Sequence, residues 1–169
     1  MLIYLVGYMG CGKTTYGRQL AKELQYSFVD LDKKIENEQG CTISQLFEAQ
    51  GEDGFRRIER EAMMSTFKMI DTVVATGGGT PCFFDNMEQL NQHGTTLYIE
   101  MDAKGLAFNL RHSLGKRPLL AGKSPEELAE YINETLQKRL PFYTQAKCKV
   151  NGIGITPQKM IDSLPQEEL

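Results

Sequence analysis

The sequence predicts an α/β protein in which helices cover both faces of a parallel sheet. Short apolar runs of strand length alternate along the chain with segments of helical periodicity. The predicted strands are nearly continuous apolar runs, which is typical of parallel strands buried on both faces. At 169 residues, the chain is long enough for one domain with a sizeable core and too short for two ordinary ones. We therefore expect residues 1–169 to form a single domain.

The expected elements follow from these runs and from helix-capping signals. The strand runs are Leu2–Val6, Phe28–Leu31, Thr72–Ala75, Thr96–Ile99 and Cys148–Val150. The helical patterns are Thr14–Leu24, Lys33–Glu38, a pair around Ser44–Met69, Asn86–Gln92, Lys104–His112, Pro125–Leu140 and a last short helix through Ser163. The predicted N-caps are Ser44, Ser124 and Thr156. In such sheets ligands bind beyond the carboxyl ends of the strands.

The first strand leads into a phosphate-binding motif. The octapeptide Gly7-Tyr8-Met9-Gly10-Cys11-Gly12-Lys13-Thr14 fits the pattern G-x-x-x-x-G-K-[ST]. Gly7 and Gly12 allow backbone angles that turn successive N–H groups toward an anion. Lys13 supplies charge for the β- and γ-phosphates, and the Thr14 hydroxyl is a ligand for Mg²⁺. The sequence therefore predicts a nucleoside triphosphate site.

The second strand ends in two carboxylates, Asp30 and Asp32. If the strand continues through both residues, their side chains point to the same side, near the phosphate loop. One carboxylate would then hold the hydration shell of Mg²⁺ while the other accepts a proton from a substrate hydroxyl. The alternative is that one or both cap the helix that begins near Lys33.

The third strand ends in Thr76-Gly77-Gly78-Gly79-Thr80-Pro81. Three consecutive glycines carry a high entropic cost. Close approach of a ligand to bare backbone, with N–H groups free to bind an oxygen, would explain them. A plain tight turn is the alternative.

Basic side chains lie between the later elements. In Gly51–Glu59, Arg56 and Arg57 either are solvated and pair with carboxylates one helical turn away or face a site. Adjacent residues on a helix point about 100° apart, so we expect at most one of the two in a site, with Phe55 packed beside it. The Gly-, Lys- and Arg-rich segment 113–123 is either a lid over phosphates or a plain surface loop.

The composition argues against several function classes. A net charge of −3 gives no electrostatic reason to expect a nucleic-acid or membrane partner. Leu2–Val6 is too short for a secretory signal, and no apolar run approaches the roughly 20 residues of a membrane span. The four scattered cysteines, Cys11, Cys41, Cys82 and Cys148, lack metal-binding spacing, as expected for free thiols in a reducing cytosol. We therefore expect a cytoplasmic protein.

Taken together, these motifs resemble those of shikimate kinases. The ordered set is G-x-x-G-x-G-K-T, D-x-D, G-E-x-x-F-R-R-x-E, T-G-G-G, R-P-L-L and R-x-x-x-Y, which spans Gly7 to Tyr143. The resemblance implies a three-layer α/β/α P-loop kinase fold, with five parallel strands in the order 2-3-1-4-5. It also implies a substrate-binding segment at about residues 32–62 and a flexible lid at about residues 112–124. The implied reaction transfers the γ-phosphoryl of ATP to the 3-hydroxyl of shikimate, with Mg²⁺, in the chorismate pathway.

The resemblance also implies roles for individual residues. Asp32, Lys13 and Arg117 would be catalytic, with Asp32 the candidate base, and Thr14 and Asp30 would hold Mg²⁺. The residues implied to bind ATP are Gly10, Cys11, Gly12, Lys13, Thr14, Thr15, Arg111 (stacked on adenine) and Arg117 (on the lid). The residues implied to bind shikimate are Asp32, Phe55, Arg56, Gly77, Gly78, Gly79 and Arg139, with Arg56 and Arg139 on the carboxylate. We expect a monomer with a small-molecule substrate.

One segment departs from the family pattern, and two other functions remain open. Asn151-Gly152-Ile153-Gly154 stands where many relatives carry an arginine in the adenine-binding loop, so this loop is expected to contact adenine through backbone or apolar groups. The first rival function is another small-molecule P-loop kinase, acting on gluconate or a nucleotide. The second is a nucleotide-dependent switch without catalytic activity.

Overall fold

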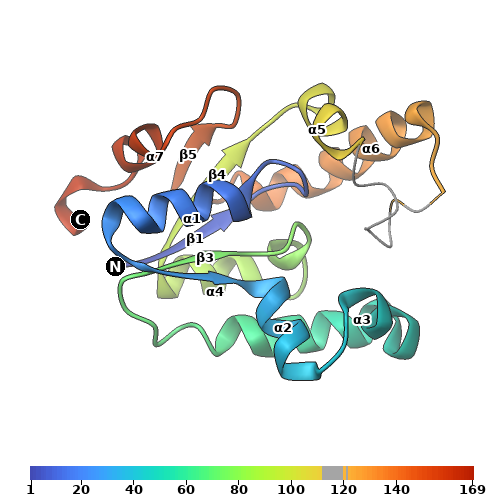
Figure 1. The fold of residues 1–169 in the computed structure, drawn as a ribbon, viewed down its shortest axis with the longest axis horizontal. Helices are drawn as coiled ribbons and strands as arrows, with labels where there is room; N and C mark the ends of the chain where they lie inside the picture. Colours follow the sequence, from blue (N-terminus) through green and yellow to red (C-terminus); the bar gives the residue numbers. More distant parts are fainter. Residues whose placement is uncertain (112–119, 121) are drawn as a thin grey trace.

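The computed structural model describes residues 1–111, 120 and 122–169. Its centre is a parallel sheet with the strand order β2-β3-β1-β4-β5 (Figure 1). The strands are β1 (Leu2–Val6), β2 (Ser27–Asp30), β3 (Thr72–Ala75), β4 (Thr95–Glu100) and β5 (Cys148–Asn151). Strand β1 lies at the centre of the sheet and is buried along its whole length. The expected strand order is confirmed.

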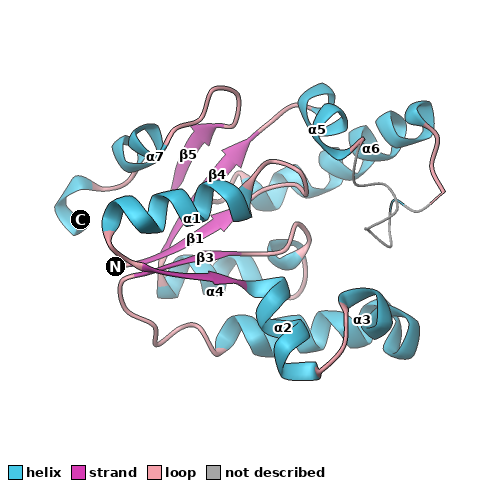
Figure 2. Cartoon of the chain, viewed as in Figure 1, coloured by secondary structure: helices cyan, strands magenta, loops and turns pink. Residues whose placement is uncertain are grey.

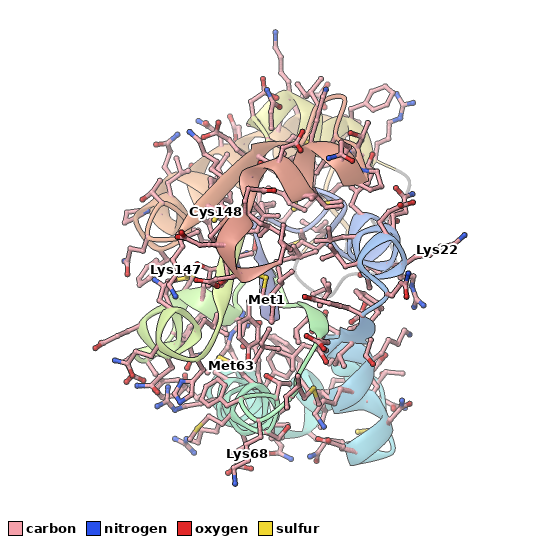
Figure 3. All side chains as sticks on the ribbon, turned by 90° about the vertical axis from the view of Figure 1, so that its left-hand side faces the viewer. Met1, Lys22, Met63, Lys68, Lys147 and Cys148 are labelled. Carbon is pink, nitrogen blue, oxygen red and sulfur yellow. The ribbon has the colours of Figure 1, made fainter. Side chains whose placement is uncertain are left out.

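The helices form layers on both sides of this sheet (Figure 2). They are α1 (Lys13–Leu24), α2 (Leu31–Gln39), α3 (Ile43–Met64), α4 (Asn86–His93), α5 (Ala103–Leu110), α6 (Pro125–Tyr143) and α7 (Pro157–Ser163). Viewed from the side on which the N-terminus lies, α1 is on one side of the sheet and α4 on the other (Figure 3). The three-layer α/β/α fold class is therefore confirmed.

Helices α2 and α3 pack against each other beside β2, the edge strand. Helix α3 is bent at Gly51, whose φ of 68° and ψ of −179° interrupt the helical geometry. The bend turns the first part of α3 toward α2, so the two helices form a separate arm next to the carboxyl ends of the strands (Figure 1). The expected pair of helices around Ser44–Met69 corresponds to the two parts of α3 on either side of Gly51, and α3 ends at Met64.

Two local expectations are wrong. Thr42, not Ser44, is the N-cap of α3, because its hydroxyl accepts from the Gln45 N–H while the Gln45 side chain accepts from the Thr42 N–H. Strand β2 ends at Asp30 and α2 begins at Leu31, so Asp32 lies on a helix rather than on an extended strand. The other two N-caps, Ser124 of α6 and Thr156 of α7, are confirmed.

The predicted lid, at about residues 112–124, lies mostly outside the described residues, and its role stays a prediction. Within residues 1–111, 120 and 122–169, no helix has the length and apolar character needed to cross a membrane.

Candidate active site

The phosphate loop connects the carboxyl end of β1 to the start of α1. Gly7, Gly10 and Gly12 adopt positive φ angles of 149°, 86° and 98°, which glycine adopts without strain. A Cβ on Gly12 would lie 2.5 Å from the ring of Tyr16, so this position is also sterically closed. Lys13 begins the helix, and its ammonium donates to the Gly7 carbonyl oxygen at 2.6 Å. The loop therefore surrounds its own lysine at the positive end of α1.

The two carboxylate oxygens of Asp30 have separate partners, and one of them makes the helix cap that the sequence offered as an alternative. One carboxylate oxygen, Oδ1, accepts from the Lys33 N–H and caps α2. The other, Oδ2, accepts from the Thr14 hydroxyl at 2.7 Å. The hydroxyl and carboxylate oxygens of Thr14 and Asp30 are ligands that suit Mg²⁺, which usually takes one or two protein carboxylates together with phosphates and water. Among the described residues, no group of three or more His, Cys, Asp or Glu is placed to hold a metal ion.

Asp32 lies in the first turn of α2 and lines the main cavity of the molecule. A Cβ on Gly77 would lie 3.2 Å from Asp32 Oδ1. The Asp32 carboxylate therefore lies against the backbone that follows β3. The switch from strand to helix, rather than strand alternation, brings it there.

The glycine turn, Gly77–Gly79, is explained by crowding. None of its residues has a φ in the left-handed region. A Cβ on Gly79 would lie 2.5 Å from Arg56 Nη2, and a Cβ on Gly78 would lie 3.4 Å from Arg139 Nη1. Two guanidinium groups thus approach the bare backbone of the turn. These contacts give a structural reason for the glycines, and the predicted close approach of a ligand stays a prediction.

Arg56 is held in a buried position on α3, with 5% of its surface exposed. Its Nη1 donates to Glu59 at 2.9 Å and its Nη2 to Glu52 at 3.3 Å. The guanidinium centre lies 4.2 Å from the Phe83 ring centroid. Arg57 is exposed, which confirms that at most one of the two arginines faces the site. Arg56 pairs within the helix as one interpretation expected, but it is buried rather than solvated, and it also lines the cavity.

Arg139 projects from α6 into the same cavity. It is 8% exposed, and its Nη1 has no hydrogen-bond partner among the described residues. Its guanidinium centre lies 5.3 Å from the ring centroid of Tyr8. An unpartnered N–H of a buried cation is costly unless an anion binds it. Nearby, the Tyr143 hydroxyl donates to the Gly78 carbonyl oxygen at 2.5 Å and ties α6 to the glycine turn.

One main cavity of about 790 Å³ brings these residues together. Its polar lining includes Lys13, Thr14, Asp30, Asp32, Arg56, Glu59, Arg139 and the glycine turn. Phe55 and Phe47 add an apolar wall, with ring centroids 4.8 Å apart. The phosphate loop and the two arginines thus face one volume.

A second cavity of about 410 Å³ adjoins the other side of the phosphate loop. It is lined by Cys11, Gly12, Thr15, Tyr16, Met101, Gly105, Phe108, Asn109, Gly152 and Ile153. Gly152 and Ile153 belong to the loop that follows β5, which the sequence analysis expected at the adenine. Asn109 lines both cavities, and its Nδ2 donates to the Gly10 carbonyl oxygen at 2.8 Å.

Two further arginines, Arg111 and Arg117, are predicted to contact ATP. Arg111 follows α5, its guanidinium centre lies 3.9 Å from the ring centroid of Phe108, and it is not part of the lining of either cavity. Arg117 lies outside the described residues. The proposed contacts of both with ATP stay predictions.

Sequence reasoning missed several residues of these cavities. Phe108 and Asn109 belong to no motif, although their place just before the lid offered a positional signal. Ile43 and Phe47 reach the main cavity from the start of α3, where their apolar spacing looked only like a helix face. Glu59 was visible solely as a helix partner of Arg56.

Fold and site together define a class of protein. The class is a P-loop kinase for a small anionic acceptor. Its parts are a phosphate loop at the end of β1, a hydroxyl–carboxylate pair beside that loop, and two arginines across one cavity. Comparison with known proteins names the family within that class. The family model described as shikimate kinase matches residues 9–167.

Individual relatives agree with this match. A shikimate kinase of Phocaeicola vulgatus is 51% identical over 145 residues, which are 86% of this chain and 83% of the relative. The crystal structure of the Bacteroides thetaiotaomicron shikimate kinase superimposes with a TM-score of 0.88 at 40% identity, covering 96% of this chain and 93% of that one. The Acinetobacter baumannii enzyme, solved in complex with shikimate, has a TM-score of 0.80 at 37% identity and covers 88% of this chain and 82% of its own. The chain belongs to the shikimate kinase family.

Proposed function

We propose that this enzyme transfers the γ-phosphoryl of ATP to the 3-hydroxyl of shikimate, giving shikimate 3-phosphate and ADP. One observation carries the proposal: two buried arginines from different elements, Arg56 and Arg139, share one cavity with the phosphate loop. Such an arrangement places an anionic acceptor opposite a triphosphate. Family membership supports shikimate as that acceptor.

The two guanidinium groups bind the shikimate carboxylate in this proposal. Planar, permanently charged guanidinium groups orient a carboxylate better than lysine would. Arg139 Nη1 and Arg56 Nε, both buried and without partners among the described residues, supply donors. The backbone of the glycine turn and the ring of Phe55 complete the walls around the sugar-like ring.

Asp32 accepts a hydrogen bond from the acceptor hydroxyl in this proposal. When the hydroxyl oxygen attacks the γ-phosphorus, the bond from that phosphorus to the β,γ-bridging oxygen breaks, and the hydroxyl proton passes to the Asp32 carboxylate. Because the transition state of phosphoryl transfer is loose, little proton transfer is needed early, and orientation of the hydroxyl is a large part of this role.

The phosphates lie in the phosphate loop in this proposal, on its N–H groups and on Lys13. The Thr14 hydroxyl and the Asp30 carboxylate would hold Mg²⁺, directly or through water. When bound, Mg²⁺ supplies positive charge that neutralises the phosphate oxygens. Arg117 would add charge from the lid.

The second cavity binds the nucleotide base in this proposal. Phe108 and Ile153 present apolar surface, and Asn109 presents an amide next to the phosphate loop. Base recognition would then depend more on stacking and apolar contact than on charge. We also propose that the enzyme is a cytoplasmic monomer without nucleic-acid or membrane partners, in keeping with its net charge of −3.

A coupled assay of ADP release across shikimate, gluconate and nucleoside monophosphates tests the function. We expect saturable turnover with shikimate alone. Turnover with gluconate or a nucleotide but not with shikimate would assign the chain to the rival kinase class. Nucleotide binding without turnover on any acceptor would favour the switch.

A further inference from the structure

The segment Thr80–Asn86 joins the glycine turn to α4, and the proposed mechanism leaves it without a function. It begins with the short helix η1 (Thr80–Cys82). The side chains of Thr80 and Asn86 are completely buried, although both are polar. Buried polar groups in such a connection require hydrogen-bond partners. Here the hydrogen bonds connect the segment to Arg56 in the proposed acceptor site.

A continuous row of hydrogen bonds runs from the surface to Arg56. Arg60 Nη1 donates to Asn86 Oδ1 at 2.6 Å, and Asn86 Nδ2 donates to the Thr80 carbonyl oxygen at 2.8 Å. The Thr80 hydroxyl donates to Glu59 Oε2 at 2.8 Å, and Glu59 Oε1 accepts from Arg56 Nη1 at 2.9 Å. In the bond between Thr80 and Glu59 the hydroxyl is the donor, because a carboxylate oxygen accepts.

Glu59 is the centre of this row. It is 1% exposed, and each of its two carboxylate oxygens has one of these partners. Without the Thr80 hydroxyl, Oε2 would lose its donor, and the carboxylate would turn or shift to find another. Because Oε1 holds Arg56, such a shift would move the guanidinium group.

The backbone of the same segment is coupled to Arg56 as well. Gly79 precedes Thr80, and a Cβ on Gly79 would lie 2.5 Å from Arg56 Nη2. Phe83 follows η1, with its ring centroid 4.2 Å from the Arg56 guanidinium centre. Asn86 holds the Thr80 carbonyl between these two contacts. The chain on either side of η1 therefore approaches the guanidinium group twice, through the Gly79 backbone and through the Phe83 ring.

We propose that Thr80 is a positioning residue for acceptor binding. Its hydroxyl fixes the Glu59 carboxylate, which fixes the plane of the Arg56 guanidinium, and Asn86 fixes the Thr80 backbone. This proposal rests on the proposed binding of the shikimate carboxylate by Arg56. Arg56 faces the acceptor and not the triphosphate, so the effect is specific to the acceptor.

The test compares Thr80→Val, which removes the hydroxyl at nearly constant volume, with Thr80→Ser, which keeps it. We expect Thr80→Val to raise the KM for shikimate about tenfold, with kcat and the KM for ATP changed less than about twofold. Thr80→Ser should stay within about twofold of wild type in all three. An equal rise of both KM values, an unchanged shikimate KM in Thr80→Val, or equal damage in Thr80→Ser would overturn the proposal.

A double-mutant cycle tests whether Thr80 acts through Arg56. In an Arg56→Ala background, Thr80→Val should raise the shikimate KM no further, because the group that it positions is gone. The same rise in both backgrounds would overturn the proposal. Turnover of shikimate by the wild-type enzyme is measured first; its absence would refute the proposed function itself, whatever the variants do.

A variant at the surface end of the row covers the case that Thr80→Val does not fold. Arg60→Met keeps the length of the side chain and removes the donor to Asn86. We expect a rise of about twofold to threefold in the shikimate KM and none in the ATP KM. If both values stay at the wild-type level, the row does not position Arg56. Thermal unfolding of each variant shows that folded enzyme is being compared.

Discussion

The two ends of the active site differ in how firmly their side chains are held. The proposed acceptor half consists of Asp32, Arg56, Arg139 and the glycine turn, and both arginines are almost fully buried. The proposed base half consists of Phe108, Asn109 and Ile153, of which Phe108 and Ile153 are 61% and 64% exposed. Both halves adjoin the same phosphate loop. In the described structure the arginines of the acceptor half are therefore more firmly held than Phe108 and Ile153 of the base half.

This difference indicates where the enzyme has its selectivity. A buried guanidinium fixed by carboxylates and an aromatic ring loses little freedom when a ligand binds, and an unsuitable ligand leaves its donors unpaired. Exposed apolar side chains can make favourable stacking contacts with almost any flat base. We therefore expect strict selection of the acceptor and looser selection of the base, and four predictions test this comparison.

The largest effect is expected at Asp32. Asp32→Asn keeps the shape of the side chain and removes the charge that accepts the hydroxyl proton. We expect kcat to fall about 10²–10³-fold while the affinity for ATP, measured by nucleotide titration, stays unchanged. Asp53→Asn, an exposed carboxylate on α3, serves as the control. A loss below about tenfold would limit Asp32 to orienting the hydroxyl, and near-normal turnover would contradict its role.

The next effect is expected at the two arginines. Arg56→Ala and Arg139→Ala should each raise the shikimate KM about 100-fold or more, since the substrate carboxylate loses a charge-assisted partner in a buried site. The KM for ATP should change less than about twofold. Arg57→Ala, next in sequence but exposed, should leave both constants unchanged. Equal effects on both substrates would contradict the comparison between the two halves.

A smaller effect is expected in the base half. Phe108→Ala removes a stacking surface, so the KM for ATP should rise about threefold to tenfold while that for shikimate stays constant. Phe84→Ala is the matched control, because Phe84 is also an exposed phenylalanine and lines neither cavity. Relative kcat/KM for ATP and GTP should differ by less than about tenfold in the wild type. Strong rejection of GTP would show that the base half recognises the base through hydrogen bonds to its edge, which would contradict this prediction.

The smallest effect is expected at Cys82, behind the acceptor half. Burial raises the pKa of the Cys82 thiol to about 11, so the reactive thiolate is scarce at pH 8 and increases only as the pH rises toward that value. We expect iodoacetamide at pH 8 to leave this residue unlabelled in the native enzyme, as measured by peptide mass spectrometry. The denatured protein, labelled in parallel, is the positive control. Rapid native labelling at pH 8 would contradict the raised pKa of this half-buried thiol.

Sequence patterns predicted the elements well and the placement of side chains less well. The phosphate loop was readable because its glycines and lysine act locally, within eight consecutive residues. Asp32 was assigned to the site for the wrong local reason, because the strand ends at Asp30, one residue before the end of its apolar run, and Asp32 lies on α2. The sequence could not decide whether Arg56 forms an ion pair on its helix or faces the site, because the i+3 spacing to Glu59 is the same in both cases.

The sequence by itself determined the order of strands and helices, the phosphate loop and the family. These depend on periodicity, on glycine conformation and on short motifs, all of which are properties of neighbouring residues. Only the tertiary structure decided that Thr80 bonds Glu59 across 21 residues of chain and that Arg139 meets the glycine turn. It also showed that Phe108 and Ile153 flank one cavity. Such contacts arise where separate elements pack together, and no local pattern records which side chains then face each other.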